Sequence, residues 1–275
     1  MKSIKIILRI AFGLLLSFSL YNSTLTAQND TLYIMKSGVV VSKFNVNTEI
    51  DSMIFYQPDI IVSPFSCGDV FTDSRDGNQY QTVQIGSQCW MAENLKYLPN
   101  VVGPGTGSND APYYYVYGYD GTDVNTAKAT ANYTTYGVLY NWPAAMNGAT
   151  SSDLNPSGVQ GVCPTGWHLP SDAEWTVLTN YLGDNAGGKL KEAGFAHWPA
   201  PNEGATNETG FTALPGGYRY LDGTFDYVGY LGDWWSATEL STDYAWYRGM
   251  YYDFSNVSRN YLSKELGFSV RCLRD

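Results

Sequence analysis

The two histidines, His168 and His197, are the side chains best suited to acid–base chemistry near neutral pH. His168 lies between a tryptophan and a Leu-Pro pair, which is typical of a packed structural residue, and His197 lies in a Pro- and Gly-rich loop. Acidic residues such as Glu192 and Glu203 could act as a pair, but their separation in space does not follow from the sequence. GxSxG, phosphate-loop and HExxH motifs are absent. Because no nucleophile–base pair can be named, the sequence disfavours an enzyme.

Four cysteines, Cys67, Cys89, Cys163 and Cys272, allow three disulfide pairings. We favour Cys67–Cys89 and Cys163–Cys272, because the first two frame one hairpin-rich segment and the last two bracket the C-terminal half. In the loop-entropy model these disulfides would contribute roughly 3 and nearly 5 kcal/mol to stability. A zinc site is the weaker interpretation, because no CxxC pair is present and the histidines are isolated.

Asp73, Asp76 and Asn78 have part of the spacing of oxygen ligands for calcium. Arg75 lies among them, however, and no downstream glutamate completes an EF-hand loop. A hairpin turn explains these residues better. We therefore expect no metal and no cofactor, and a structural calcium ion stays open as the alternative.

The segment 243–261 is dense in Tyr, Asp, Ser and Asn, a composition that suits molecular recognition. Tyrosine gives rigid contact area, small polar residues adapt their hydrogen bonds, and aromatic faces stack on sugar rings. Even positions from Tyr244 would share one face of a strand, and Trp246, Met250 and Phe254 are the candidates for the core. The predicted ligand-binding residues are Asp243, Tyr244, Trp246, Tyr247, Tyr251, Tyr252, Asp253, Ser255, Asn256, Arg259 and Tyr261.

The elements that must position these residues include a few short helices. Ser171 and Glu174 form a capping box, and apolar residues then recur at helical spacing, which predicts a helix over 172–182. A second short helix is predicted over 189–193, and Pro143 suits the first turn of another.

Short strands and long loops account for the remainder of the domain. A turn at 73–78 enters a strand over 80–83, and the aromatic stretch 113–119 is a strand that closes on a hairpin signal at Asp120-Gly121. Aromatic residues make up 15% of the chain, which favours strands and structured loops over helical bundles. The predicted fold class is α+β.

The N-terminus has the pattern of an export signal. Residues 1–9 carry three basic residues, an apolar run covers 10–20, and cleavage is expected after Ala27. An uncleaved membrane anchor is the alternative, which the short apolar run disfavours. Removal of residues 1–27, with three basic and no acidic residues, changes the net charge from −10 to −13. Such a charge disfavours nucleic acid and anionic membranes as partners.

Residues 28–64 are predicted to form a small β extension and linker before a main domain over 65–275. Two runs, 31–35 and 39–41, are separated by a hairpin turn, and 44–46 and 50–56 continue the short-strand pattern.

Three segments of the main domain carry a family resemblance: Gly166-Trp-His-Leu-Pro170, Trp234-Trp-Ser-Ala-Thr238 and Gly267-Phe-Ser-Val-Arg-Cys272. Together with 76–95 and 136–142, they resemble the Fibrobacter succinogenes major paralogous domain, found in secreted proteins of Bacteroidetes-type bacteria. The resemblance implies a C-type-lectin-like fold, which presents loops for binding more often than it does chemistry. It also supports Cys163–Cys272, since lectin-like domains commonly tie the final strand back.

The resemblance also bears on calcium and on catalysis. The lectin sugar–calcium tripeptide is matched only by Gln57-Pro-Asp59, which lies outside the main domain. The fold is shared with formylglycine-generating enzymes, whose copper site needs two close cysteines near the C-terminus; here only Cys272 is in that region, so their oxidation cannot be carried over.

Segment 243–261 further resembles the variable region of proteins targeted by diversity-generating retroelements, in which adenine mutation converts Asn codons into Tyr, Asp or Ser codons. The expected function is an exported, secreted or cell-surface adhesion module that recognises a glycan or a surface protein through this segment. A structural envelope protein whose aromatics serve packing is the rival, and a relative of the oxidase enzymes is the weaker one.

Overall fold

The computed structural model describes residues 31–36, 39–45 and 65–275. The chain divides into two compact units, Met1–Pro64 and Phe65–Asp275, and each is considered by itself. In the first unit, β1 (Thr31–Lys36) and β2 (Val39–Asn45) pair antiparallel, which confirms the predicted hairpin. The predicted export signal (1–27) and the predicted strand over 50–56 lie outside the described residues.

The second unit contains a five-stranded sheet, a four-stranded sheet and two short strand pairs. The order in the five-stranded sheet is β11-β10-β12-β13-β14, and in the four-stranded sheet β5-β6-β15-β9. The strands are β3 (Phe71–Thr72), β4 (Gln79–Tyr80), β5 (Thr82–Ile85), β6 (Gln88–Met91), β7 (Tyr114–Tyr115), β8 (Leu139–Tyr140), β9 (Trp167–His168), β10 (Gly216–Arg219), β11 (Phe225–Val228), β12 (Leu231–Glu239), β13 (Tyr244–Tyr251), β14 (Ser258–Ser263) and β15 (Leu273–Arg274).

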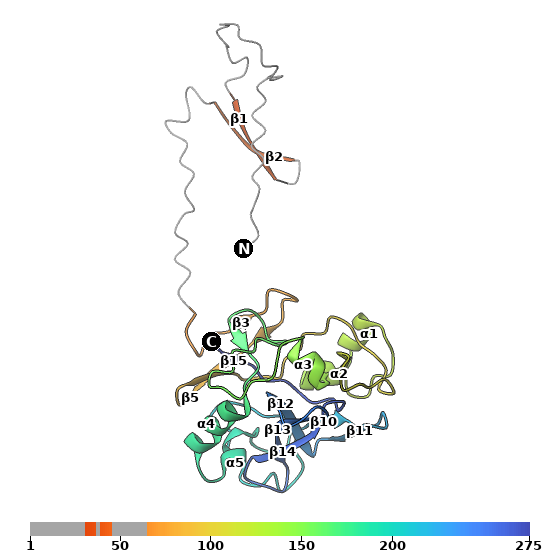
Figure 1. The fold of residues 1–275 in the computed structure, drawn as a ribbon. Helices are drawn as coiled ribbons and strands as arrows, with labels where there is room; N and C mark the ends of the chain where they lie inside the picture. The colour runs from red at the N-terminus through yellow and green to blue at the C-terminus, as the bar shows by residue number, and fades with distance from the viewer. Residues whose placement is uncertain (1–30, 37–38, 46–64) are drawn as a thin grey trace. The chain divides into compact units, whose positions relative to one another are not determined.

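Five short helices accompany these sheets: α1 (Val124–Lys128), α2 (Ala131–Tyr136), α3 (Trp142–Met146), α4 (Asp172–Leu182) and α5 (Ala186–Leu190). In Figure 1, α4 and α5 lie on one side of the β12–β14 region and α1 to α3 on the other. Mixed sheets with a few short helices confirm the predicted α+β class.

Helix α4 begins and ends where the sequence predicts. The Ser171 hydroxyl accepts a hydrogen bond from the Glu174 amide, and the Glu174 carboxylate accepts one from the Ser171 amide, so the capping box is complete. Trp175 and Leu178 then face the core, where both are fully buried. The predicted helix at Pro143 is also present, because the Asn141 side chain caps α3.

The second predicted helix, over 189–193, is wrong in its position. Helix α5 covers Ala186–Leu190 instead, and the backbone at Lys191 is extended and pairs with Ala213. Two glycines made this segment a poor helix candidate. They allow close approach, since a Cβ on Gly187 or Gly188 would collide with backbone atoms of neighbouring loops.

The predicted strand over 113–119 is also much shorter than expected. Only β7 (Tyr114–Tyr115) is extended, and it pairs with β8 rather than closing a hairpin at Asp120-Gly121. Helices α1 and α2 occupy the intervening chain, and their caps are the side chains of Asp123 and Thr130. The pairing partner comes from later in the chain, which local periodicity does not reveal.

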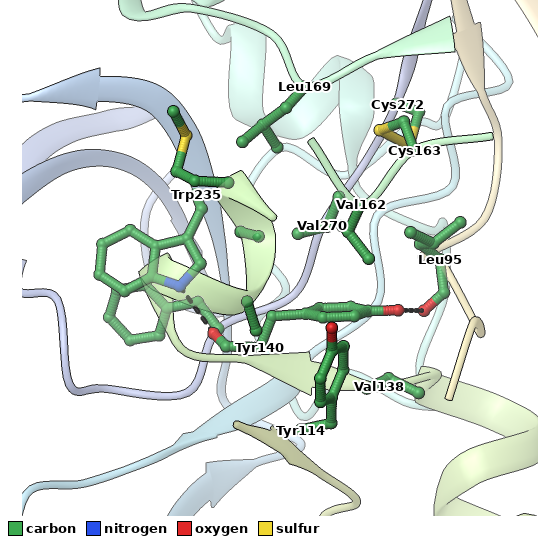
Figure 2. Close-up of a cluster of buried hydrophobic side chains, with 14 of the residues drawn as sticks. Leu95, Tyr114, Val138, Tyr140, Val162, Cys163, Leu169, Trp235, Val270 and Cys272 are labelled. Atoms are coloured by element: carbon green, nitrogen blue, oxygen red, sulfur yellow. Dashed lines mark hydrogen bonds between the residues drawn. A yellow bond between two sulfur atoms is a disulfide. The ribbon is translucent and has the colours of Figure 1, made fainter. Parts of the chain in front are cut away.

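One of the two hydrophobic clusters surrounds Trp235 and Tyr140 (Figure 2). The Trp235 indole N–H donates to the Tyr140 carbonyl at 2.7 Å, and the Tyr140 hydroxyl donates to the backbone of Tyr97 at 2.9 Å. Burial therefore leaves neither polar group of these aromatic side chains without a partner. The Cys163–Cys272 disulfide lies in the same cluster.

Candidate functional site

The predicted recognition segment is the hairpin of β13 and β14, and β14 is the edge strand of the five-stranded sheet. The structure separates most of the predicted ligand-binding residues into two groups and leaves Asp243 and Tyr247 outside both. We call the first group, on one face of the strands, the strand face: Tyr244, Trp246, Arg259 and Tyr261. Asp243 precedes β13, and its carboxylate accepts a hydrogen bond from Asn109 Nδ2 at 3.3 Å. We call the second group, around the turn, the hairpin tip: Tyr251, Tyr252, Asp253, Ser255 and Asn256.

The strand face is an ordered row of aromatic rings. Trp246 is paired with Tyr261 across the strands, and their ring centroids are 5.3 Å apart at 80°. Tyr244 lies 6.2 Å from Tyr261 at 84°, so three rings meet edge to face. Tyr244 and Tyr261 are each 44% exposed, and Trp246 is half-buried. The row is packed on itself and still open to solvent.

Arg259 completes this row, because its guanidinium lies 3.8 Å above the centroid of the Trp246 ring. Asp172, the first residue of α4, accepts hydrogen bonds from Arg259 Nε at 3.0 Å and Nη2 at 2.9 Å. Half of the Arg259 side chain is exposed. The guanidinium is thus held in place by the carboxylate and the ring while it remains accessible.

Asp172 also binds Arg248, whose Nη1 lies 2.6 Å from Asp172 Oδ1. Arg248 is only 1% exposed, and burial lowers the pKa of its guanidinium. Burial alone would raise the pKa of Asp172, but hydrogen bonds and charges from Arg259 and Arg248 lower it. Asp172 is therefore ionised at neutral pH and anchors two arginines of neighbouring strands to one helix N-terminus.

The hairpin tip is fixed through its backbone. Lys191 Nζ donates to the carbonyls of Tyr251 at 2.8 Å and Phe254 at 3.1 Å. Burial lowers the pKa of Lys191 to about 8. The Gly188 amide donates to the Ser255 carbonyl at 2.7 Å. The tip backbone is thus held in place.

Side chains at the tip differ in accessibility. Asp253 and Asn256 are exposed, whereas Tyr251 and Tyr252 are half-buried. The Tyr252 ring packs edge-on against Tyr230, with centroids 5.4 Å apart. The Asn256 amide oxygen accepts a hydrogen bond from the Asn185 backbone at 2.9 Å, so part of its polar capacity is used within the protein.

The structure shows for three residues of the hairpin whether the side chain lies in the core or at the surface. Tyr247 is 4% exposed and packs against Trp235 and Phe268 in the core, so its side chain is not available to a ligand. We therefore include Tyr247 in neither the strand face nor the hairpin tip. Met250 is fully buried, as predicted. Phe254 was a predicted core residue, and this is wrong, because it projects from the tip and is 46% exposed.

The cysteines are paired as predicted. Cys67 and Cys89 form one disulfide, and Cys163 and Cys272 form the other, with sequence separations of 22 and 109 residues. The second joins the last strand region to the loop before β9. Both bonds are compatible with an exported protein, since disulfides persist in oxidising compartments.

His168 lies between two carboxylates. Its Nε2 is 2.9 Å from Glu174 Oε1 and its Nδ1 is 2.7 Å from Asp275 Oδ1. Burial alone would lower the pKa of His168, but hydrogen bonds and charges from Glu174 and Asp275 raise it. The imidazole is buried and connects the capping box of α4 to Asp275, which agrees with a structural role. His197 forms a separate, partly exposed pair with Glu192 at 2.9 Å.

The turn at Asp73 uses its carboxylate internally. Arg75 Nε and Nη2 donate to both carboxylate oxygens of Asp73, with the shortest distance 2.6 Å, and Asp76 accepts from the backbone and side chain of Asn78. These contacts favour the turn over a calcium site. Within the part of the chain that the structure describes, no three His, Cys, Asp or Glu side chains gather closely enough to hold a metal ion.

Sequence reasoning missed two residues that organise the strand face, Asp172 and Arg248. Asp172 was assigned only to the start of a helix, and Arg248 only to a strand. No local signal connects them, because they are 76 residues apart. A charged residue at a strand position between apolar neighbours was the one hint that a buried partner existed.

The second unit is therefore a disulfide-linked α+β domain with an ordered aromatic strand face. A family model described as the Fibrobacter succinogenes major domain matches residues 83–274, and the chain belongs to this family. This confirms the resemblance that the sequence motifs carry. No curated protein and no solved structure matched the chain.

Proposed function

We propose that the protein is an exported binding module that recognises a glycan or a surface protein through the strand face. The observation that carries this proposal is the arrangement of Trp246, Tyr261 and Arg259, in which two rings and a guanidinium are locked together and still reach solvent. A surface ordered before binding loses little side-chain entropy when a ligand arrives. The C-type-lectin-like fold implied by the family resemblance belongs to the same proposal.

The chemistry of the strand face suits both ligand classes. Exposed tyrosine and tryptophan rings stack on the apolar faces of sugars, and Tyr, Trp and Arg are also the residues enriched at the energetic centres of protein interfaces. Arg259 keeps donors free for hydroxyl or carboxylate groups, since Arg has five N–H donors and its bonds to Asp172 use only Nε and Nη2. Asp243, just before β13, is an exposed acceptor, and its carboxylate already receives a hydrogen bond from Asn109 Nδ2 at 3.3 Å.

The charge and the covalent framework support an extracellular setting. A net charge of −10 for the whole chain disfavours nucleic acid as a partner. Both disulfides suit an oxidising compartment. Among the described residues, no helix has the length and apolar character needed to cross a membrane.

The retroelement hypothesis extends this proposal to the gene. Deep sequencing of codons 241–263 across a population and related isolates tests it. Clustered substitutions at adenine positions would support diversification. Changes at Tyr244, Asp253 and Tyr261 are the most informative, because these side chains are exposed and can vary without disturbing the core. An invariant segment would contradict it and leave a fixed ligand.

The function itself is tested with glycan and surface-protein arrays probed with the full chain. The double variant Tyr244→Ser/Tyr261→Ser should lose binding and keep its thermal unfolding temperature, since both rings are partly exposed. Tyr181→Ser is the matched control, because Tyr181 is 65% exposed on α4 and its ring lies against Gly86, outside the strand face. No binding by the unmodified chain would favour the structural envelope role instead, and equal binding by the double variant would place recognition outside the strand face.

A further inference from the structure

A second open surface lies at β10 and β11, toward the edge of the five-stranded sheet opposite β14. It is a pocket of about 550 Å³, which is within the usual range for small-molecule sites. None of its lining residues belongs to the strand face. Five tyrosines line it: Tyr117, Tyr218, Tyr220, Tyr227 and Tyr230.

Three of the tyrosine rings of this pocket lie close together and are tilted relative to one another. Tyr218 lies 5.6 Å from Tyr227 at an angle of 36°, and 6.0 Å from Tyr220 at 48°. Tyr227 is 55% exposed, and Tyr220 is 41% exposed. These rings face solvent and are not part of the core. Their π-faces, which carry negative electrostatic potential, are therefore gathered in one place.

The backbone places Tyr227 in this group through an uncommon conformation. Its φ is +61°, in the left-handed region that a tyrosine rarely adopts. Opposite it in the β10–β11 pair, Gly217 has φ +62°, and a Cβ there would collide with the backbone of Asp226 and Val228. The left-handed conformation thus occurs at both positions, and the Tyr227 ring lies against Tyr218.

Two aspartates, Asp222 and Asp226, complete the lining together with Val228, and the lining contains no lysine, arginine or histidine. Thr224 lies between them, with its hydroxyl 2.8 Å from Asp222 Oδ1 and 2.7 Å from Asp226 Oδ2. Hydrogen bonds from the backbone and hydroxyl of Thr224 lower the pKa of Asp222. The lining therefore places two carboxylates beside a set of aromatic faces, and the Arg219 guanidinium acts on Asp222 from outside the lining.

We propose that this pocket binds an organic cation, namely an alkylated or primary ammonium group carried by a small molecule or by a lysine side chain of a partner protein. Aromatic faces attract ammonium groups through the ring quadrupole, and the two carboxylates add a direct charge. A neutral sugar could stack on the rings and donate hydroxyl hydrogen bonds to the carboxylates, but it would leave their charge unbalanced. The cation matches both the aromatic faces and the negative charge of the two carboxylates.

The proposal is tested by titrating the full chain with choline while tyrosine ring resonances are followed by NMR, at constant ionic strength. The neutral analogue 3,3-dimethylbutan-1-ol has the same shape without the charge and serves as the ligand control. A lysine-containing peptide, compared with its norleucine counterpart, distinguishes a protein-borne ammonium from a free one. Saturable shifts with choline or with the lysine peptide, and none with the neutral partner of each, support the proposal.

Three variants localise the effect. Tyr227→Gly removes one ring where glycine suits the backbone, so the fold should be kept and binding should weaken about 2- to 30-fold. Asp222→Asn combined with Asp226→Asn should weaken binding and reduce its salt dependence, while Tyr181→Ser should bind normally. Equal binding of the charged and neutral ligands, no saturable binding of either cation, or unchanged affinity in Tyr227→Gly would overturn the proposal. Binding of a neutral methyl glycoside in place of the cations would assign the pocket to sugars instead.

Discussion

Asp172→Asn is the substitution that most directly tests how the strand face is supported. Asparagine keeps the shape of the side chain and removes its charge. Arg248, which is 1% exposed and 2.6 Å from Asp172 Oδ1, is then left without its carboxylate. Its remaining acceptors carry no net charge: the Asp172 carbonyl at 3.0 Å, the Thr176 hydroxyl at 2.9 Å and the Tyr247 carbonyl at 3.4 Å.

The expected loss of unfolding free energy is about 3–5 kcal/mol, the usual cost of removing one partner of a buried ion pair. The second pair, with Arg259, adds at most about 1 kcal/mol, because that guanidinium is half exposed and screened by solvent. For a domain of this size, the loss corresponds to a fall of about 6–20 °C in Tm. Urea denaturation and calorimetry at pH 7 measure it.

The pH dependence gives an independent check. The folded-state pKa of Asp172 is lowered, so its contribution is fully present above the unfolded value of 3.8 and is lost as the pH falls through the folded pKa. The stability difference between the wild-type protein and Asp172→Asn should therefore shrink below about pH 4.

Asp172→Asn/Arg248→Met is the matched control, because it removes the stranded charge together with its partner. This double variant should recover part of the lost stability. A loss below about 1 kcal/mol in the single variant, or a double variant no more stable than the single one, would refute the reasoning.

Three further predictions concern stability. Replacing Cys163 and Cys272 with serine opens a loop with a sequence separation of 109 and should cost about 4–5 kcal/mol in urea denaturation. The folded-state pKa of His168 is raised above 6.5, so wild-type stability should fall as pH rises through that pKa, and His168→Gln should flatten this profile between about pH 6 and 8. Asp233 is buried, and its Oδ1 atom has no hydrogen-bond partner among the described residues. Burial raises the pKa of the Asp233 carboxyl well above 3.8. Its contribution should decline as pH rises above 3.8, and Asp233→Asn should be more stable than the wild-type protein at pH 7 by thermal unfolding.

The sequence predicted the elements that short-range signals specify. Helix α4 follows from a capping box of residues three apart, and α3 follows from Pro143 in its first turn. The disulfide pairing could be chosen from the three possible ones because each pair of cysteines brackets a segment that the sequence makes recognisable. The α+β class followed from composition and turn spacing in the same way.

Features that depend on distant contacts were missed. Helix α5 contains two glycines that allow other loops to approach closely. Helix propensity treats glycine only as unfavourable, so it did not predict a helix at this position. The anchoring of Arg259 by Asp172 joins residues 87 apart. Tyr247 lies on the opposite face of β13 from Trp246, as strand alternation predicts, and it is buried in the core, but composition had grouped it with the surface tyrosines.

Titration calorimetry with a ligand selected from the arrays measures most directly whether the strand face binds a ligand. Tyr and Trp at the centre of an interface typically contribute at least about 2 kcal/mol each when truncated. The account therefore predicts that Tyr244→Ser/Tyr261→Ser binds at least about 30-fold more weakly than the wild-type chain, while Tyr181→Ser binds equally well. An affinity of the double variant within about twofold of the wild-type value would contradict the account and place recognition elsewhere on the protein.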